Sequence, residues 1–169
     1  MTTNADGAQA ELPPAGGKKL SRAEIMQMTG FEMVKGLSAN VVPRPPMKQI
    51  MPFEMLMPER IGEVELVATP EPRFANLLNM VNGGWGMTLL DTVMGLAAQS
   101  TLNVGEMAPT HETSVKFIRP IPLDIGPLRI IGKVVSQGKT LITLEGRIEN
   151  YEGKLFAHGT STCVAVSAL

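Results

Sequence analysis

The sequence predicts an α+β domain in which an antiparallel sheet wraps around one long helix. Residues 82–102 form a long apolar segment without proline, a composition typical of a buried helix. One strand region precedes this segment, and four strand-like segments separated by turn signals follow Pro109. A strand region, a single helix and then consecutive strands is the pattern of an α+β domain.

Composition excludes several classes of function. The chain has 169 residues with 15 basic and 16 acidic side chains, so its formal net charge is −1, and 44% of its residues are hydrophobic. This balance gives no basic surface for nucleic acid. Cys163 is the only cysteine, so no internal disulfide forms, and no Cys/His spacing suits zinc. We therefore expect no metal and no cofactor.

The N-terminal region predicts a tail and then a single domain. Residues 1–20 are polar and lack apolar periodicity, so we expect a disordered tail, with the folded domain spanning residues 21–169. An apolar signal segment is absent from the start, which favours a reduced cytoplasmic compartment. Ser21 and Glu24 form a capping-box pattern, which predicts an N-terminal helix over residues 21–36.

The strands are expected on both sides of the long helix. Residues 47–68 contain one or two strands interrupted by Pro58 and Gly62. The four later strands are predicted over residues 111–118, 128–135, 140–148 and 155–166.

The central helix over residues 82–102 carries the most informative side chain. Residues 74–105 contain one charged side chain, Asp91. Asn82 is a plausible N-cap, and the polar residues within this segment favour burial in a protein core over a membrane span. A carboxylate on an apolar helix is costly unless it is partnered, so Asp91 is either a catalytic base or nucleophile, or a residue bonded to backbone groups or facing a wet interface.

The two glycines after Asn82 are the second candidate feature. Gly83 and Gly84 present backbone N–H groups at a helix N-terminus, where they can polarise a carbonyl; alternatively, they only permit a tight turn. Gly83 and Asp91 are about 12 Å apart along one helix at 1.5 Å per residue. One reacting carbonyl cannot contact both, so a joint site requires two antiparallel copies of the helix in a homodimer.

An ordered set of motifs resembles the phenylacetate-pathway (PaaI-like) branch of the hotdog-fold acyl-CoA thioesterases. Asn76 is followed at family spacing by Asn82-Gly83-Gly84 and then by Leu89-Leu90-Asp91. Further matches are Phe117-Ile118-Arg119-Pro120, Gly138-Lys139 and the segment 153–158. The resemblance covers roughly residues 36–166.

This resemblance implies a hotdog fold with a five- to six-stranded sheet, dimers that can pair into tetramers, and hydrolysis of acyl-CoA. Asp91 falls on the catalytic carboxylate, Gly83 on the N–H that polarises the thioester carbonyl, and Asn76 on the residue that positions the carbonyl or water. The remaining assignments are Thr110 as the hydroxyl that orients water or the carboxylate, and Gly84, Gly138 and Lys139 as substrate- or CoA-binding residues. Asn82 replaces the family histidine; it can donate a hydrogen bond but cannot gain a proton.

Three functions follow, in order of support. The first is an acyl-CoA thioesterase that takes a small-molecule substrate and binds neither nucleic acid nor membrane. The second is an acyl-CoA or fatty-ligand binding protein with little catalysis, which the exchange at Asn82 motivates. The third is a hotdog-fold dehydratase, which requires a His paired with an acid, and neither His111 nor His158 has an obvious partner by spacing.

Overall fold

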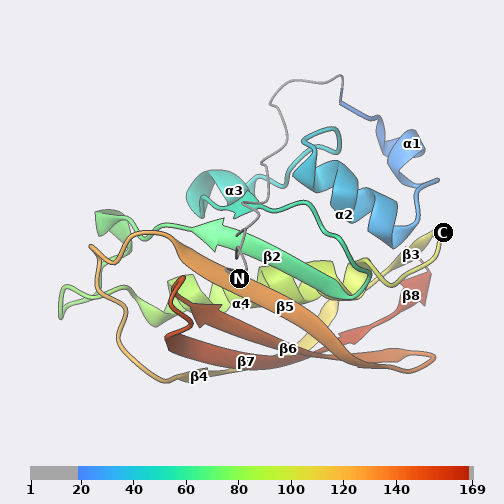
Figure 1. The fold of residues 1–169 in the computed structure, drawn as a ribbon. Coiled ribbons are helices and arrows are strands. Elements are labelled where there is room, and N and C mark those ends of the chain that lie inside the picture. Colours follow the sequence, from blue (N-terminus) through green and yellow to red (C-terminus); the bar gives the residue numbers. More distant parts are fainter. Residues whose placement is uncertain (1–18, 168–169) are drawn as a thin grey trace, which may run out of the picture.

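The computed structural model describes residues 19–167. Of the tail expected over residues 1–20, all but Lys19 and Leu20 lies outside the described residues; Leu20 N–H donates to the Val41 carbonyl at 2.9 Å. The elements, shown in Figure 1, are α1 Arg22–Ile25, α2 Gly30–Ser38, α3 Met47–Ile50, β1 Glu54–Met55, β2 Glu63–Ala68, η1 Pro72–Phe74, α4 Gly83–Gln99, β3 Glu106–Met107, β4 Thr110–Phe117, β5 Leu128–Gln137, β6 Leu141–Glu149, β7 Leu155–Val164 and β8 Val166–Ser167.

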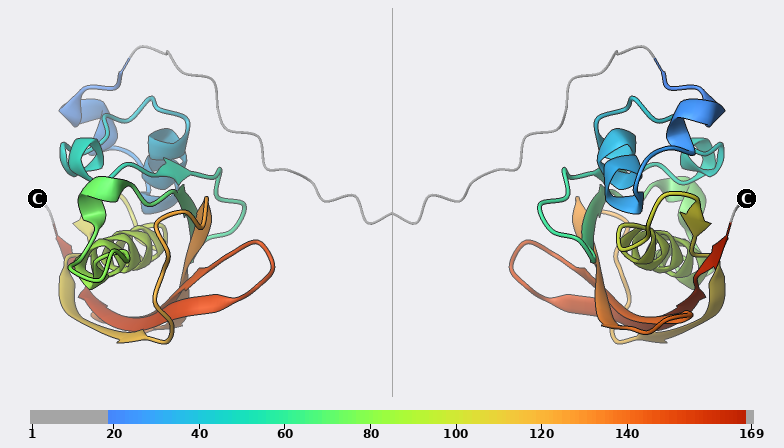
Figure 2. Two further views of the ribbon diagram at one scale, coloured as in Figure 1. Left: turned by 90° about the vertical axis from the view of Figure 1, so that its left-hand side faces the viewer. Right: turned by 90° about the vertical axis from the view of Figure 1, so that its right-hand side faces the viewer.

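Six strands form one antiparallel sheet in the order β1-β2-β5-β6-β7-β4. The sheet curls around α4, which is seen nearly end-on in both views of Figure 2. This arrangement confirms the predicted α+β class. The strand β4, which follows α4 and the short β3 in the sequence, pairs with β7 on one side only and is an edge strand; its outer edge pairs with no strand among residues 19–167.

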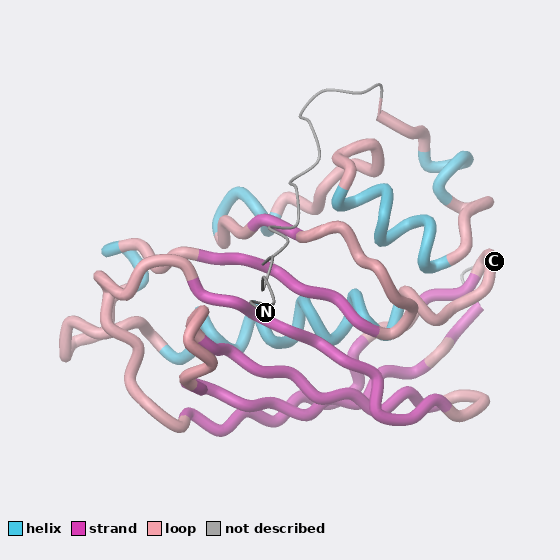
Figure 3. Tube along the Cα trace, viewed as in Figure 1, coloured by secondary structure: helices cyan, strands magenta, loops and turns pink. Residues whose placement is uncertain are grey.

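Buried side chains of α4 and of the sheet strands form one core cluster. Figure 3 shows the backbone arrangement, with the magenta strands curving past the cyan helix. Four α4 side chains, Leu89, Leu90, Val93 and Met94, are fully buried. Burying each is worth about 1.5–3 kcal/mol. Gly132 of β5 permits the close approach, because a Cβ there would lie 2.6 Å from the Val93 carbonyl oxygen. Within the described part of the chain, no helix is long and apolar enough to cross a membrane.

The predicted helix over residues 21–36 is two helices, α1 and α2. A second capping box divides them: Thr29 Oγ1 accepts from Glu32 N–H at 3.3 Å, and the Glu32 carboxylate accepts from Thr29 N–H at 2.8 Å. These bonds start a new helix, as a capping box does. α2 then continues through Gly36 to Ser38, beyond the predicted end.

Two further boundaries differ from the prediction. The central helix ends at Gln99, not at residue 102, because the hydroxyls of Ser100 and Thr101 bond back to carbonyls of the preceding turn and compete with the helical pattern. Residues 47–50, expected to be extended, form the short helix α3 directly after Pro46, whose ring pre-sets a helical φ.

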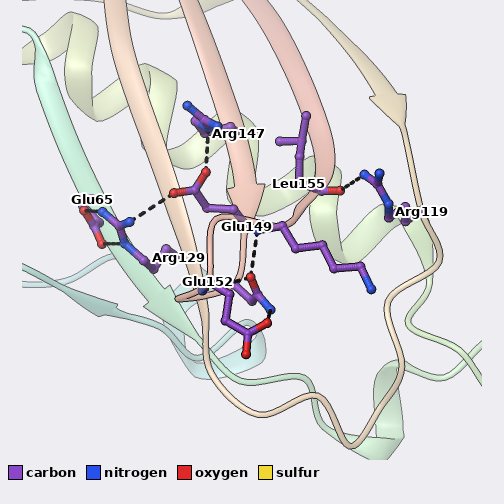
Figure 4. Close-up of polar contacts among 9 residues, drawn as sticks. Glu65, Arg119, Arg129, Arg147, Glu149, Glu152 and Leu155 are labelled. Atoms are coloured by element: carbon purple, nitrogen blue, oxygen red, sulfur yellow. Dashed lines mark hydrogen bonds and ion pairs between the residues drawn. The ribbon is translucent and has the colours of Figure 1, made fainter.

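A network of charged side chains joins three strands on the outer face of the sheet (Figure 4). Arg129 of β5 bonds both Glu65 oxygens, at 2.6 and 2.8 Å, and one Glu149 oxygen at 3.0 Å. Arg147 Nε contacts the second Glu149 oxygen at 2.8 Å. The hydrogen bonds that Arg129 donates to Glu65 raise the pKa of Arg129 above its ordinary value. We call these four side chains the outer-face network; every oxygen of its two carboxylates is engaged.

Candidate active site

Asn82 caps α4, as predicted, and this leaves one particular backbone donor unused. The Asn82 side-chain Oδ1 accepts from Gly84 N–H at 2.8 Å, and the Asn82 carbonyl accepts from Trp85 N–H at 3.0 Å. Gly83 N–H donates to no acceptor among residues 19–167. Because the first N–H groups of a helix carry positive partial charge, Gly83 presents a free donor for an anionic or carbonyl oxygen.

Asn76 lies in a tight loop that brings it beside the start of α4. Its Oδ1 accepts from the N–H groups of Leu78 and Met80, at 2.8 and 3.2 Å. A pocket of about 310 Å³ has Asn76, Asn82 and Gly83 in its wall. The structure therefore brings together three of the residues that the sequence analysis assigned to one site.

The ring of Phe117, at the end of β4, closes one side of this pocket. A Cβ atom on Gly83 would lie 2.9 Å from Phe117 Cζ, so the close approach requires glycine unless the ring moves. Phe117 is 54% exposed and the next residue, Ile118, is 46% exposed. The pocket thus opens where the free edge of β4 presents apolar side chains to solvent.

A second pocket, of about 400 Å³, lies on the other flank of the helix start. Gly84, Trp85 and Thr88 line it from α4, and Met47 and Ile50 line it from α3. Trp85 is buried, and its indole Nε1 has no hydrogen-bond partner within the described residues. Apolar and thioether side chains of this kind form adaptable surfaces for apolar groups.

Asp91 lies farther along α4 and faces the opposite end of β4. Its side chain is half-buried, and Oδ1 accepts from Thr110 Oγ1 at 2.9 Å and from Thr113 Oγ1 at 3.3 Å. Its partners are therefore hydroxyls rather than backbone groups. Asp91 Oδ2 accepts no hydrogen bond from residues 19–167.

A β-bulge makes both threonine contacts possible. Side chains three residues apart in a regular strand point to opposite faces. The pairing of β4 with β7 shifts between Thr110 and Glu112, so His111 is an extra residue and the alternation changes phase. Thr110 and Thr113 consequently reach the same carboxylate oxygen.

Two residues that sequence reasoning missed complete this cluster. Thr113 Oγ1 lies 3.1 Å from Ser161 Oγ of β7, and Ser161 donates to the Glu112 carbonyl at 2.8 Å. Cys163 Sγ is 4.0 Å from Thr110 Oγ1, and burial raises the pKa of the Cys163 thiol. The bulge has no recognisable sequence signal here, so no pattern pointed to Thr113 or Ser161.

The remaining candidate residues lie away from the Gly83 pocket. Gly138 and Lys139 form the exposed β5–β6 turn, where Gly138 N–H donates to the Leu141 carbonyl at 2.8 Å. Thr110 of β4 pairs with Cys163 of β7, and Cys163 pairs with Ile142, the second residue of β6 after the turn. The turn therefore lies at the Thr110 end of the sheet. No group of three or more His, Cys, Asp or Glu side chains within residues 19–167 could hold a metal ion.

The candidate site is therefore in two halves within one chain. The first half consists of Asn76, Asn82 and Gly83 at the Phe117 end of β4. The second half is Asp91 with its hydroxyl partners, at the Thr110 end. The eight-residue separation along α4 corresponds to about 12 Å, too far for one carbonyl carbon to contact both halves.

Sequence comparisons identify the type of domain. Residues 78–157 match the family model of the thioesterase superfamily. A curated protein of Saccharolobus solfataricus, named as an esterase, is 36% identical over 78 residues, which are 46% of this chain and 54% of that protein. The match thus spans about half the length of this curated relative.

Solved structures with the same fold include proteins bound to CoA or its derivatives. A Streptococcus pneumoniae thioesterase with coenzyme A has a TM-score of 0.61 and 27% identity, over 68% of this chain and 86% of that one. A Streptococcus mutans protein bound to acetyl-CoA has a TM-score of 0.61 and 26% identity, over 68% and 89%. A thioesterase related to phenylacetic acid degradation, from Ralstonia eutropha, shares the fold with a TM-score of 0.70 at 24% identity, over 81% and 99%. Residues 78–157 therefore match the thioesterase superfamily, and the described residues have the hotdog architecture of these solved structures.

Proposed function

We propose that this protein hydrolyses acyl-CoA to a free acid and CoA. Two groups on α4 carry the proposal, because neither has a hydrogen-bond partner within residues 19–167: the Gly83 N–H, which can donate to a substrate oxygen, and Asp91 Oδ2, which can accept a proton. The relatives solved with coenzyme A and acetyl-CoA support CoA as the thiol part of the substrate.

In the proposed reaction the thioester carbonyl oxygen accepts a hydrogen bond from Gly83 N–H. This donor stabilises the negative charge that develops on the oxygen in the transition state. Asp91 Oδ2 removes a proton from water, whose oxygen attacks the carbonyl carbon; the C–S bond then breaks, and the CoA sulfur receives the proton. Direct attack by the Asp91 carboxylate is the alternative, with water hydrolysing the resulting anhydride. Asn76 positions the carbonyl or the water, and Thr110 orients the carboxylate.

Two chains would supply one site in a homodimer. The free edge of β4 can pair with the β4 edge of a second copy, which covers the unpaired backbone groups of both. Antiparallel pairing brings the Thr110 end of one strand to the Phe117 end of the other. The Asp91 half of one chain would then meet the Gly83 half of its partner, with the Gly138–Lys139 turn on the same side, where it can contact the CoA moiety.

A panel of acyl-CoA substrates tests the activity, with free CoA measured by a thiol reagent. We expect turnover by the wild type and its loss in Asp91→Asn; a wild type that releases no CoA from any acyl-CoA contradicts the proposal.

Mixing two inactive variants tests the shared site. In Gly83→Pro the first residue of the helix tolerates proline but loses its N–H. Randomly exchanged dimers of Asp91→Asn and Gly83→Pro chains contain hybrids with one intact site, so about a quarter of the wild-type rate should return for a C2 dimer. If each site belongs to a single chain, mixing restores no activity.

An acyl-CoA binding protein with little catalysis is the second candidate. Asn82 favours it, since its amide caps α4 at Gly84 and cannot exchange a proton. Tight binding of acyl-CoA by the wild type without CoA release would establish this function in place of hydrolysis.

A further inference from the structure

The two oxygens of Asp91 have unequal surroundings. Both hydroxyl contacts, from Thr110 and Thr113, converge on Oδ1, whereas Oδ2 has no donor among residues 19–167. An oxygen held by two hydroxyls is already solvated by the protein. Oδ2 therefore remains the oxygen that can take a proton from water or bond to a substrate carbon.

The hydroxyl groups near Asp91 Oδ1 make more hydrogen-bond contacts than they have hydrogens to donate. Ser161 donates its one hydrogen to the Glu112 carbonyl at 2.8 Å, so it can only accept in its 3.1 Å contact with Thr113. Thr113 is then the donor of that contact, but the same hydrogen also serves its 3.3 Å contact with Asp91 Oδ1. One hydrogen thus has two acceptors, a carboxylate and a neutral hydroxyl.

We propose that Thr113 is a positioning residue whose hydroxyl turns between Asp91 and Ser161 as Asp91 loses and gains a proton at Oδ2. A hydrogen bond to an ionised acceptor is roughly twice as strong as one between neutral groups, so Thr113 donates to Asp91 while the carboxylate is charged. Once Oδ2 takes the proton, Oδ1 becomes a weaker acceptor and the hydrogen turns to Ser161. Because Ser161 then accepts from Thr113, the Thr113 hydroxyl keeps a hydrogen-bond acceptor after Asp91 is protonated. Without Ser161, the cost of an unsatisfied Thr113 hydroxyl would oppose the proton transfer. The catalytic consequence rests on the proposed thioesterase function.

The other groups around Asp91 do not supply a competing titration. α4 carries no other charged residue, and Cys163, facing the cluster from β7, is a neutral thiol in the acid range because burial raises its pKa. On β4, His111 and Glu112 are exposed. The strands and the helix that cover the rest of α4 present apolar side chains to it, among them Val34, Leu66, Ile130 and Leu144.

Two substitutions should move the acid limb of the pH dependence of kcat/KM in opposite directions. Thr113→Val has nearly the same shape but removes a donor to the carboxylate, so the acid limb should move up by about one pH unit. Ser161→Ala removes the competing acceptor, so Thr113 donates to Asp91 alone and the limb should move down by about half a unit. Two control variants accompany these substitutions. Thr113→Ser retains the hydroxyl and should keep the wild-type pH profile. Ser114→Ala, on the outward face of the same strand, is the matched control, and it should not move the acid limb.

A titration of the Asp91 carboxyl carbon by NMR, on the full chain, separates this inference from the proposed function. If the wild type releases no CoA but the two variants displace the titration in opposite directions, the thioesterase proposal fails and the hydroxyl switch stands. The opposite result is a wild type that is active, an Asp91→Asn variant that is not, and a titration that Thr113→Val and Ser161→Ala leave unchanged or move in the same direction. That result would overturn the hydroxyl switch but not the thioesterase proposal.

Discussion

Two polar clusters lie on opposite faces of the same sheet and differ in how completely their acceptors are used. In the outer-face network, Arg129 and Arg147 engage every oxygen of two carboxylates. In the cluster at Asp91, two hydroxyls share one oxygen and the other is left unbonded within the described residues. The first arrangement can only hold strands together, whereas the second keeps an acceptor that a substrate or water can use. Substitutions in the two clusters should therefore separate stability from activity.

The largest effect should come from exchanging Asp91 for Asn. Loss of a general base lowers the rate by about 10²–10⁴-fold, and CoA release from the best substrate of the panel measures it. The unfolding free energy should change by less than about 1 kcal/mol, because an amide can still accept from Thr110. Glu149→Gln is the matched exchange in the outer-face network, and it should leave the rate unchanged while lowering stability. Equal rates for the two variants would contradict the contrast between the clusters.

Gly83 should give the next largest effect. Gly83→Pro removes the backbone donor, and Asn82 already has the extended conformation that a residue before proline needs, so the rate should fall by about 10²–10³-fold. Gly83→Ala adds the same Cβ against Phe117 but keeps the N–H, so it should lose less activity. Comparing the steady-state rates of the two variants separates the effect of the lost N–H donor from that of the added Cβ. Equal losses of activity would show that packing against Phe117, not the donor, causes the loss.

Arg129→Met should lower the unfolding free energy by about 1–2 kcal/mol, because the Glu149 side chain, 7% exposed, then keeps Arg147 as its one ion-pair partner among residues 19–167. Urea unfolding followed by the fluorescence of Trp85, the only tryptophan, measures this. The control is Arg73→Met, whose ion pair with Glu71 is about half exposed, so its loss should cost under about 0.5 kcal/mol. Similar losses in the two variants would mean that the network stabilises no more than a surface pair.

The smallest effect concerns the capping box that starts α2. The backbone and side-chain hydrogen bonds from Thr29 hold the pKa of Glu32 below its ordinary value of 4.5. A carboxyl with a lowered folded-state pKa stabilises the fold above the ordinary value and loses that contribution as the pH falls through the folded-state value. Thermal midpoints of Glu32→Gln and wild type should thus differ at pH 7 and converge on acidification below 4.5. Glu59→Gln, at an exposed glutamate for which no hydrogen bond is found within residues 19–167, is the matched control, with no change in thermal midpoint expected at pH 7. A constant offset for Glu32→Gln at all pH values would contradict the argument.

The predicted and observed elements agree where local patterns are strong. The apolar helix starting after Asn82 and the four long strands after it are found, with bounds that differ from the predicted ones; the last strand, predicted over residues 155–166, ends at Val164, and Val166–Ser167 pairs with β3 instead. The N-terminal region agrees less well: Thr29 and Glu32 form a second capping box that divides the expected helix. That signal was present in the sequence, but the apolar spacing across residues 21–36 suggested one continuous helix.

For the candidate site, too, the residues in local motifs are predicted from the sequence, whereas those brought together by strand pairing are not. Asn76, Asn82 and Gly83 were grouped by motif spacing and do line one pocket, and the predicted partnership of Asp91 with Thr110 corresponds to a 2.9 Å hydrogen bond. Thr113 and Ser161 were missed because their proximity depends on the bulge at His111 and on pairing between strands far apart in the sequence.

The sequence alone determined the class of the domain, the long buried helix and the single charge on it, because these follow from composition and from short-range periodicity. Tertiary structure alone decided which oxygen of Asp91 is held and which hydroxyls hold it. It also leaves the Gly83 N–H, the donor that the family resemblance implies, without an acceptor within residues 19–167. These outcomes depend on strand register and on the direction of individual hydrogen bonds. A one-residue bulge reverses the face to which a side chain points without leaving a mark in the local sequence pattern.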